Sequence, residues 1–271
     1  MPKPRYLTKS RFKLALECET KLFYTGKTEY PDKKKTDSFL IALADGGFQV
    51  GELAKAYHPG GHEVEEIKNK DKALEETNAL LKKENVTIFE AAVRFENLFI
   101  RIDVLRKKGN VFDLVEVKAK SFEDEADFTD RNGNVATKWK PYMIDVAFQD
   151  YVLSKAFPGA TVRSHLMLAD KNARTSVDGL NQHFKIEKNS SGRTQARMVG
   201  DVSLEALGEK ILKEVDVQKY VQQLQSDTYE VNGSTYSCEE EISFLSGRYV
   251  IEESVPPRID CRVCAECQFR A

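Results

Sequence analysis

Three side chains in the middle of the chain are of the types that bind a divalent cation and activate water. Asp103 stands in the apolar run 100–105, and Glu116 and Lys118 stand in the run 114–119. Residues two apart on a β-strand point to the same face, so Glu116 and Lys118 should lie side by side. Charged groups on an inner strand are costly to bury unless they are paired or bind a metal. The spacing predicts a carboxylate pair for a divalent ion, formed by Asp103 and Glu116, with Lys118 placed to orient or deprotonate a water molecule.

A purely structural explanation fits the same residues. Glu-x-Lys is common in strands, and a solvated antiparallel strand with an alternating polar face has the same pattern. Glu90, in the apolar run 86–95, has the same two explanations. It either faces the site from the first strand or is a solvated or paired structural glutamate.

The cysteines form the second group with metal-binding chemistry. Five is an odd number, and Cys261, Cys264 and Cys267 repeat at three-residue spacing, whereas Cys18 and Cys238 stand alone. The N-terminus has basic residues but no apolar signal segment, so disulfides are not expected. The spacing therefore favours metal ligation over disulfides. Zinc bound by four thiolates is one form that this site could take.

Hydrophobic periodicity indicates the elements that must position these residues. Helical spacing predicts helices over 8–24, 38–57 (interrupted at 45–47), 70–83, 142–156 and 204–224. Segments rich in β-branched and aromatic residues predict strands over 86–95, 98–107, 111–119 and 161–168, with an exposed loop over 121–135. Short turns separate the first three strands, so we expect a three-stranded antiparallel meander followed by a helix and a fourth strand. This order is typical of an α/β fold.

Length and composition limit the class of protein. The 271 residues suffice for a full hydrophobic core, and we expect a core over 1–170 with an extension over 171–271. The 41 basic and 43 acidic residues give a net charge of −2, which argues against a polybasic protein but leaves room for a local basic face. No apolar run approaches the roughly 18 residues of a membrane span, so a soluble, cytoplasmic protein is expected. Because the chain stops four residues after Cys267, we expect a fragment of a longer protein.

The pattern Asp-x12-Glu-x-Lys on a meander, followed by a helix and a strand, resembles the PD-(D/E)XK nuclease superfamily, in particular its RecB-like exonuclease branch. The resemblance covers residues 7–168 and implies a restriction-endonuclease-like core with helical additions at both ends. It also implies that Asp103 and Glu116 bind Mg²⁺ or Mn²⁺ and that Lys118 activates water. The family has a Gln-x-x-x-Tyr motif on the next helix, near the substrate strand. Gln149 matches it, but Leu153 stands at the tyrosine position and Tyr151 is two residues after Gln149.

A further motif of this family, Gly-x-x-x-His or the same with Glu, lies on the helix before the meander. Here Gly51 stands at the histidine position of the segment starting at Gly47, and Glu52 follows it. The resemblance implies that Glu52 is an additional ligand of the metal or its water, whereas an ordinary charged helix residue is the alternative. The segment 53–61 also resembles an uncharacterised bacterial domain family of this superfamily.

Some RecB-like nucleases, including the CRISPR adaptation exonucleases, hold a 4Fe–4S cluster with one N-terminal and three C-terminal cysteines. The resemblance implies that Cys18, Cys261, Cys264 and Cys267 do so here. The last gap is shorter than is usual in the family, and Glu19 stands where many relatives have proline. Zinc remains the main alternative.

We expect a Mg²⁺- or Mn²⁺-dependent deoxyribonuclease, with an exonuclease favoured over an endonuclease. It would act on DNA either by itself or as part of a larger DNA-processing assembly. The alternative is a catalytically inactive nucleic-acid-binding or structural module with a metal bound by its cysteines. The segment Lys138-Trp139-Lys140 either contacts nucleic acid or anchors the rim of the core.

Overall fold

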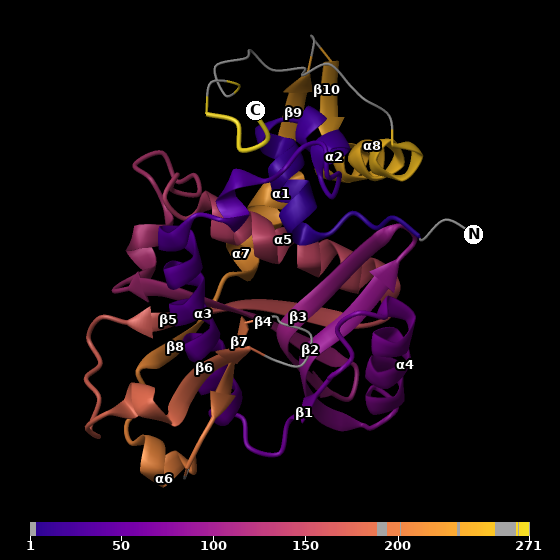
Figure 1. The fold of residues 1–271 in the computed structure, drawn as a ribbon. Helices are drawn as coiled ribbons and strands as arrows, with labels where there is room; N and C mark the ends of the chain where they lie inside the picture. The colour runs from indigo at the N-terminus through magenta and orange to yellow at the C-terminus, as the bar shows by residue number, and fades with distance from the viewer. Residues whose placement is uncertain are drawn as a thin grey trace.

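The computed structural model describes residues 4–188, 194–200, 202–231, 234–252, 264 and 266–270. Its centre is a mixed six-stranded sheet in the order β1-β2-β3-β4-β5-β8 (Figure 1). The strands are β1 (His62–Glu63), β2 (Asn85–Phe95), β3 (Leu98–Lys108), β4 (Val111–Phe122), β5 (Thr161–Asp170) and β8 (Leu212–Asp216). The predicted α/β class is confirmed.

The predicted meander is present as β2, β3 and β4, which pair antiparallel. Tight turns join the strands, with Glu96 and Gly109 in the left-handed region at φ of 48° and 57°. The crossover helix α5 (Lys140–Ala156) then brings β5 parallel to β4. This strand–helix–strand unit requires the helix to cross one face of the sheet, and α5 contacts β2, β3, β4 and β5 there.

Helices cover both faces of the sheet. One face packs against α1 (Lys9–Glu17), α4 (Lys70–Leu80), α5, α7 (Gln218–Ser226) and α8 (Cys238–Ile251), whose buried side chains join one apolar core with the strands. The other face packs against α3 (Ser38–Ala56), the hairpin of β6 (Phe184–Lys188) and β7 (Thr194–Met198), and α6 (Leu204–Leu207). The remaining elements are short: α2 (Thr20–Tyr24), η1 (Lys33–Lys35), η2 (Glu125–Phe128), η3 (Leu180–His183), β9 (Thr228–Val231) and β10 (Ser234–Ser237).

Two N-terminal helices differ from their predictions. The helix expected over 8–24 divides into α1 and α2 because Cys18 adopts an extended backbone, with φ of −168° and ψ of 120°. The interruption expected at 45–47 is absent, since α3 runs without a break from Ser38 to Ala56. Asp37 caps its first turn by accepting from two backbone amides, and Leu53 and Ala54 anchor its last turns in the core. These two ends hold the helix through Gly46 and Gly47 in spite of the low helix propensity of glycine.

The single amphipathic helix predicted over 204–224 is wrong in its middle part, since only its two ends are helical, as α6 and as the first seven residues of α7. Gly208 has a φ of 70° and ends α6 after one turn, because a left-handed residue cannot continue a right-handed helix. Residues 212–216 form β8, which pairs antiparallel with β5 and buries Leu212 and Val215. Residues beyond 170 therefore contribute a strand to the central sheet. No helix in the described ranges is both long and apolar enough to cross a lipid bilayer.

Candidate active site

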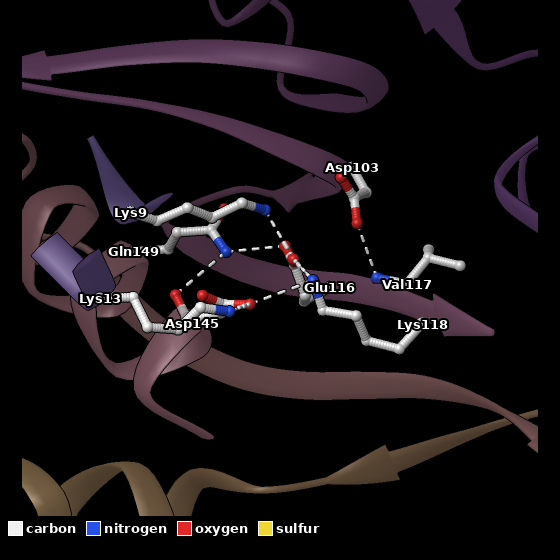
Figure 2. Close-up of polar contacts among 8 residues, drawn as sticks. All are labelled: Lys9, Lys13, Asp103, Glu116, Val117, Lys118, Asp145 and Gln149. Atoms are coloured by element: carbon white, nitrogen blue, oxygen red, sulfur yellow. Dashed lines mark hydrogen bonds and ion pairs between the residues drawn. The ribbon is translucent and has the colours of Figure 1, made fainter. Parts of the chain in front are cut away.

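Asp103 lies where two strands of the meander separate. The register of β3 against β4 runs from Lys108 paired with Val111 to Val104 paired with Val115 and stops there. At the next position the Asp103 Oδ2 accepts a hydrogen bond from the Val117 backbone amide over 2.7 Å (Figure 2). The side chain thus replaces a bond of the strand ladder, and its carboxylate lies in the opening between β3 and β4.

Glu116 is fully buried beside this opening and is the centre of a charged network. Its Oε1 lies 2.6 Å from the Lys118 Nζ and 2.6 Å from the Lys9 Nζ. Its Oε2 accepts from the Gln149 Nε2 over 2.7 Å. Glu116 and Lys118 share one sheet face, as their spacing predicts. The donors come from β4, α1 and α5, so three elements must fold together before this carboxylate is satisfied (Figure 2).

Asp145 is a second buried carboxylate of the site that the sequence interpretation missed. Its Oδ2 lies 3.0 Å from the Lys13 Nζ and 3.1 Å from the Lys118 Nζ. It stands four residues before Gln149 on α5, and residues four apart share a helix face, so a signal for it was present in the sequence. The Asp145 Oδ1 and the Gln149 Oε1 are both buried and accept no hydrogen bond from the described residues. These two oxygens on α5 can therefore each accept a further hydrogen bond.

The two strand carboxylates have opposite electrostatic environments. Burial, followed by the negative charge of Glu116, raises the pKa of Asp103 to about 7. Burial also raises the pKa of Glu116, but the ammonium groups of Lys9 and Lys118 outweigh it and hold that pKa well below its ordinary value. Burial lowers the pKa of Lys118, but the carboxylates of Glu116, Asp145 and Asp103 together raise it above its ordinary value. Glu116 forms ion pairs with two ammonium groups, whereas the hydrogen bond that Asp103 accepts among the described residues comes from a neutral amide. Lys9 and Lys118 lower the pKa of Asp103 without outweighing burial and Glu116, so this carboxylate would gain from a closer cation.

The donor atoms suit a small, hard divalent cation. Proteins usually bind Mg²⁺ through one or two carboxylates, and water molecules or substrate phosphate oxygens complete its coordination. Asp103 and Glu116 would therefore be enough protein ligands. Over the described residues, no group of three or more His, Cys, Asp or Glu side chains is arranged to hold a metal ion. The Lys9 ammonium also occupies the Glu116 Oε1, so a cation bound there would have to share or displace it.

The structure does not bring Glu52 into this network. Glu52 lies on α3 with its carboxylate 2.7 Å from the Lys55 Nζ, beside a cavity of about 600 Å³ that Glu63, Glu90 and Arg101 also line. No hydrogen bond or ion pair between described residues joins it to Asp103 or Glu116. Glu90 lies between the two regions, since its charge raises the pKa of both Glu52 and Asp103. Glu90 also has a φ of 53° and pairs with Arg101 over 3.2 Å.

Two aromatic residues near the site have structural contacts. The Tyr151 hydroxyl donates to Glu239 on α8 over 3.2 Å, so no described contact ties it to Glu116. Trp139 is 1 % exposed and packs edge-on against the Phe128 ring, with centroids 4.8 Å apart. Trp139 is therefore an anchor of the core, which was one of its two predicted roles, and Lys138 beside it pairs with Asp127 over 2.8 Å.

Cysteines from the two ends of the chain approach one another. Burial raises the pKa of Tyr24, and the charges of Tyr30, Cys18, Cys264 and Cys267 add to this shift. The three described cysteines of this set are nevertheless not arranged as a group that could hold a metal ion. The C-terminal segment is fixed there by two contacts: the Lys33 amide donates to the Gln268 carbonyl over 3.1 Å, and the Tyr24 and Phe269 rings lie 5.8 Å apart. Cys261 lies outside the described residues. Cys238 belongs to a different place, the start of α8.

The structure thus gathers four of the predicted site residues at one point: Asp103, Glu116, Lys118 and Gln149. It adds three that were not predicted, namely Lys9, Lys13 and Asp145. No described contact brings Glu52 or Tyr151 into this group. No protein-family model matches the chain, and no curated protein is significantly similar to it. Inferences about activity therefore depend on the geometry of this site and on the sequence motif.

Proposed function

We propose that this chain is a metal-dependent deoxyribonuclease of the RecB-like branch of the PD-(D/E)XK superfamily, built on a restriction-endonuclease-like core. The observation that carries the proposal is the convergence of Asp103, Glu116, Lys118 and Gln149 from β3, β4 and α5 where β3 and β4 separate. Two carboxylates and a lysine on adjacent strands suit phosphodiester hydrolysis, since this reaction needs a cation and an oriented water molecule.

Asp103 and Glu116 would hold Mg²⁺ or Mn²⁺. When bound, such an ion supplies a Lewis acid that stabilises charge on the phosphate and lowers the pKa of the attacking water. Asp103 favours this role because burial and the charge of Glu116 outweigh the nearby Lys9 and Lys118, so a directly bound cation would stabilise its charged form.

The remaining side chains would position the reacting groups. Lys118 lies 2.6 Å from the Glu116 Oε1 and 3.1 Å from the Asp145 Oδ2, so two carboxylates hold its ammonium in one place. From there it would orient the water or neutralise charge that develops on the phosphate. Gln149 fixes the other oxygen of Glu116, and its own free Oε1 would accept a hydrogen bond from the water or the substrate strand.

We further propose that Cys18, Cys261, Cys264 and Cys267 bind a 4Fe–4S cluster, with zinc as the alternative. The contacts that fix the C-terminal segment beside Lys33 and Tyr24, a few residues from Cys18, support a site shared by both chain ends. Cys18, Cys264 and Cys267 alone are not arranged to hold a metal ion, so the proposal requires Cys261 or a rearrangement of the segment. Such a site would fasten α1, which carries Lys9, to the C-terminal segment. It would stabilise the arrangement on which the Glu116 network depends.

Cleavage of end-labelled DNA in Mg²⁺ or Mn²⁺, with an EDTA control, tests the nuclease. Asp103→Ala and Lys118→Ala should each lower the rate by at least about 100-fold, since each removes several kcal/mol of transition-state stabilisation. Asp71→Ala and Lys72→Ala, at exposed positions on α4, are the matched controls and should retain the wild-type rate. Equal metal-dependent cleavage by the wild type, Asp103→Ala and Lys118→Ala would refute the assignment.

One observation favours the second candidate, a nucleic-acid-binding or structural module without activity. The Glu116 carboxylate is already saturated by Lys9, Lys118 and Gln149, as in a structural ion-pair network. This candidate predicts DNA binding, or assembly with other DNA-processing proteins, without cleavage in any divalent metal.

A further inference from the structure

A basic hollow lies near the turn that joins β3 to β4, away from the Glu116 network. It has a volume of about 460 Å³, which is within the size range of pockets that bind small molecules. The start of β2, the end of β3 and the segment before β1 form its walls. Lys108 lines it and follows Asp103 by five residues on β3, so the two residues lie roughly 17 Å apart along the strand. The hollow is therefore separate from the proposed nuclease site.

Positive charge gathers in this hollow without carboxylates to balance it. Its described lining residues include an arginine and three lysines, and no Asp or Glu is among them. Arg106 is already paired with Asp113 and Glu214, so it contributes no free charge. The three lysines form no ion pair with a carboxylate in the described part of the chain; they are Lys83, Lys107 and Lys108. Three uncompensated ammonium groups thus border one open space, which makes it attractive to anions.

Neutral groups hold two of these lysines at the hollow. The Lys83 Nζ lies 2.9 Å from the His62 Nε2, and the Lys107 Nζ donates to the Lys83 carbonyl over 2.7 Å. Neither contact removes the charge of the ammonium group. Gly61 permits this arrangement, because a Cβ there would collide with the Phe89 ring and push the segment that carries His62 away from β2. The cations are therefore in place before any ligand binds.

Backbone amides of β2 complete the site. The pairing of β1 with β2 begins opposite Ile88, so the first residues of β2 have no partner strand on this side. The Val64 amide donates to the Phe89 carbonyl, so Phe89 directs its backbone groups toward β1. Because these groups alternate in direction along a strand, the amides of Asn85 and Thr87 point to the same open edge, and both residues line the hollow. Two amide donors thus stand beside the three ammonium groups.

This set of donors suits a compact anion that carries several negative oxygens. Consecutive phosphate groups supply such oxygens, and lysine is a common phosphate ligand in proteins. A nucleic-acid strand fits less well, since it needs a basic groove that continues along its backbone. Here the chain neighbours of His62 and Lys83 are the exposed acidic residues Glu63 and Glu84. We propose that the hollow binds the polyphosphate group of a small molecule, either inorganic polyphosphate or a nucleoside triphosphate.

Titration with inorganic tripolyphosphate in EDTA, followed by calorimetry and by ¹H–¹⁵N NMR spectra, tests this proposal. We expect saturable binding, with amide shifts at Asn85, Thr87 and Lys108 and none at Glu116 or Gln149. ATP should shift the same amides and adenosine should not. Tighter binding of ATP than of tripolyphosphate would identify a nucleotide as the ligand, whereas equal binding would show that the phosphates alone are recognised.

Substitution of single lysines separates a defined site from general surface charge. Lys83→Gln and Lys108→Gln should each weaken tripolyphosphate binding about 10-fold or more, since each removes a charged donor to the anion. Lys82→Gln is the matched control, because Lys82 is the exposed neighbour of Lys83 and does not line the hollow. It should bind as the wild type does. Circular dichroism of each variant checks that the fold is retained.

Three results would overturn the proposal. The first is the absence of saturable binding at about 1 mM tripolyphosphate. The second is an equal loss of affinity in Lys82→Gln, which would show that only diffuse surface charge attracts the anion. The third is oligo-dT that binds in EDTA through Lys83 and Lys108 more tightly than tripolyphosphate, which would assign the hollow to nucleic acid. The site does not depend on the nuclease: a chain that never cleaves DNA but binds tripolyphosphate in this way keeps the inference and loses only the activity.

Discussion

Lys9 and Glu116 lie 107 residues apart in the sequence, yet the Lys9 Nζ is 2.6 Å from the buried Glu116 Oε1. This contact ties the first helix to the central sheet. Lys9 is 22 % exposed at its side chain and Glu116 is inaccessible to solvent, so the charge of the carboxylate depends on its lysine partners. The pKa of Lys9 is raised because Glu116 and Asp103 favour its charged form more than burial opposes it.

Loss of Lys9 should destabilise the metal-free protein. Lys9→Met removes one of two ammonium groups from a buried carboxylate, and we expect the free energy of unfolding to fall by about 1.5–3 kcal/mol, the range for a hydrogen bond to a charged group. Urea unfolding in EDTA measures this change. Lys155→Met is the control, because its pair with Glu239 is exposed and should contribute less than about 1 kcal/mol. An equal decrease in the free energy of unfolding of the two variants would show that the buried Lys9 contact stabilises the protein no more than an exposed ion pair does.

The meander and its three charged residues could be predicted because their signals are local. Alternation along β4 places Glu116 and Lys118 on one face whatever the rest of the chain does. Lys9 could not be predicted in the same way. It stands near the start of a charged helix, where a solvated lysine has the same sequence context, and only the packing of α1 against α5 gives it a buried partner.

The segment 204–224 shows the opposite case, a local signal that tertiary structure overrides. Leu207, Ile211 and Val215 recur at helical spacing, but Val215 also alternates with charged neighbours as a strand residue does. Pairing with the free edge of β5 decides for the strand, and Gly208 permits the turn before it. The position of Glu52 could not be predicted for a related reason: its motif lies on α3, which packs on the other face of the sheet from the Glu116 network, and Glu52 pairs there with Lys55.

Removal of Cys18 should release any metal bound at the chain ends. If Cys18 shares a site with the C-terminal cysteines, anaerobically purified protein should contain iron and sulfide and be brown. Cys18→Ser should lose both and unfold at a lower temperature, because metal binding free energy contributes to folding when the unfolded chain has no site. Cys238→Ser is the matched control and should keep the metal. Colourless protein with zinc would support the alternative ligation, and a full metal content in Cys18→Ser would exclude Cys18 as a ligand.

Cys238 should react slowly with alkylating reagents. Burial raises the pKa of its thiol to about 11, with Asp227 and Glu241 adding to the shift and a hydrogen bond with Tyr229 opposing it. Because the thiolate is the reactive form, its fraction at pH 8 should be about one-hundredth of that of a thiol with a pKa near 9. The alkylation rate should rise about tenfold for each pH unit between pH 8 and 10. Peptide mapping after iodoacetamide treatment measures it, and rapid, pH-independent labelling would contradict the burial of Cys238 at the start of α8.

The most direct test of the central claim is the cleavage rate of Glu116→Gln in saturating Mn²⁺, measured in single turnover on end-labelled single-stranded DNA. Glutamine keeps the size of the side chain and removes the charge that Asp103 and Glu116 would together present to the cation. We expect the rate to fall at least about 100-fold relative to the wild type, with circular dichroism and the gel-filtration volume unchanged. Cleavage by Glu116→Gln at the wild-type rate would contradict it, since a nuclease whose metal is held by Asp103 and Glu116 cannot retain its rate without that charge.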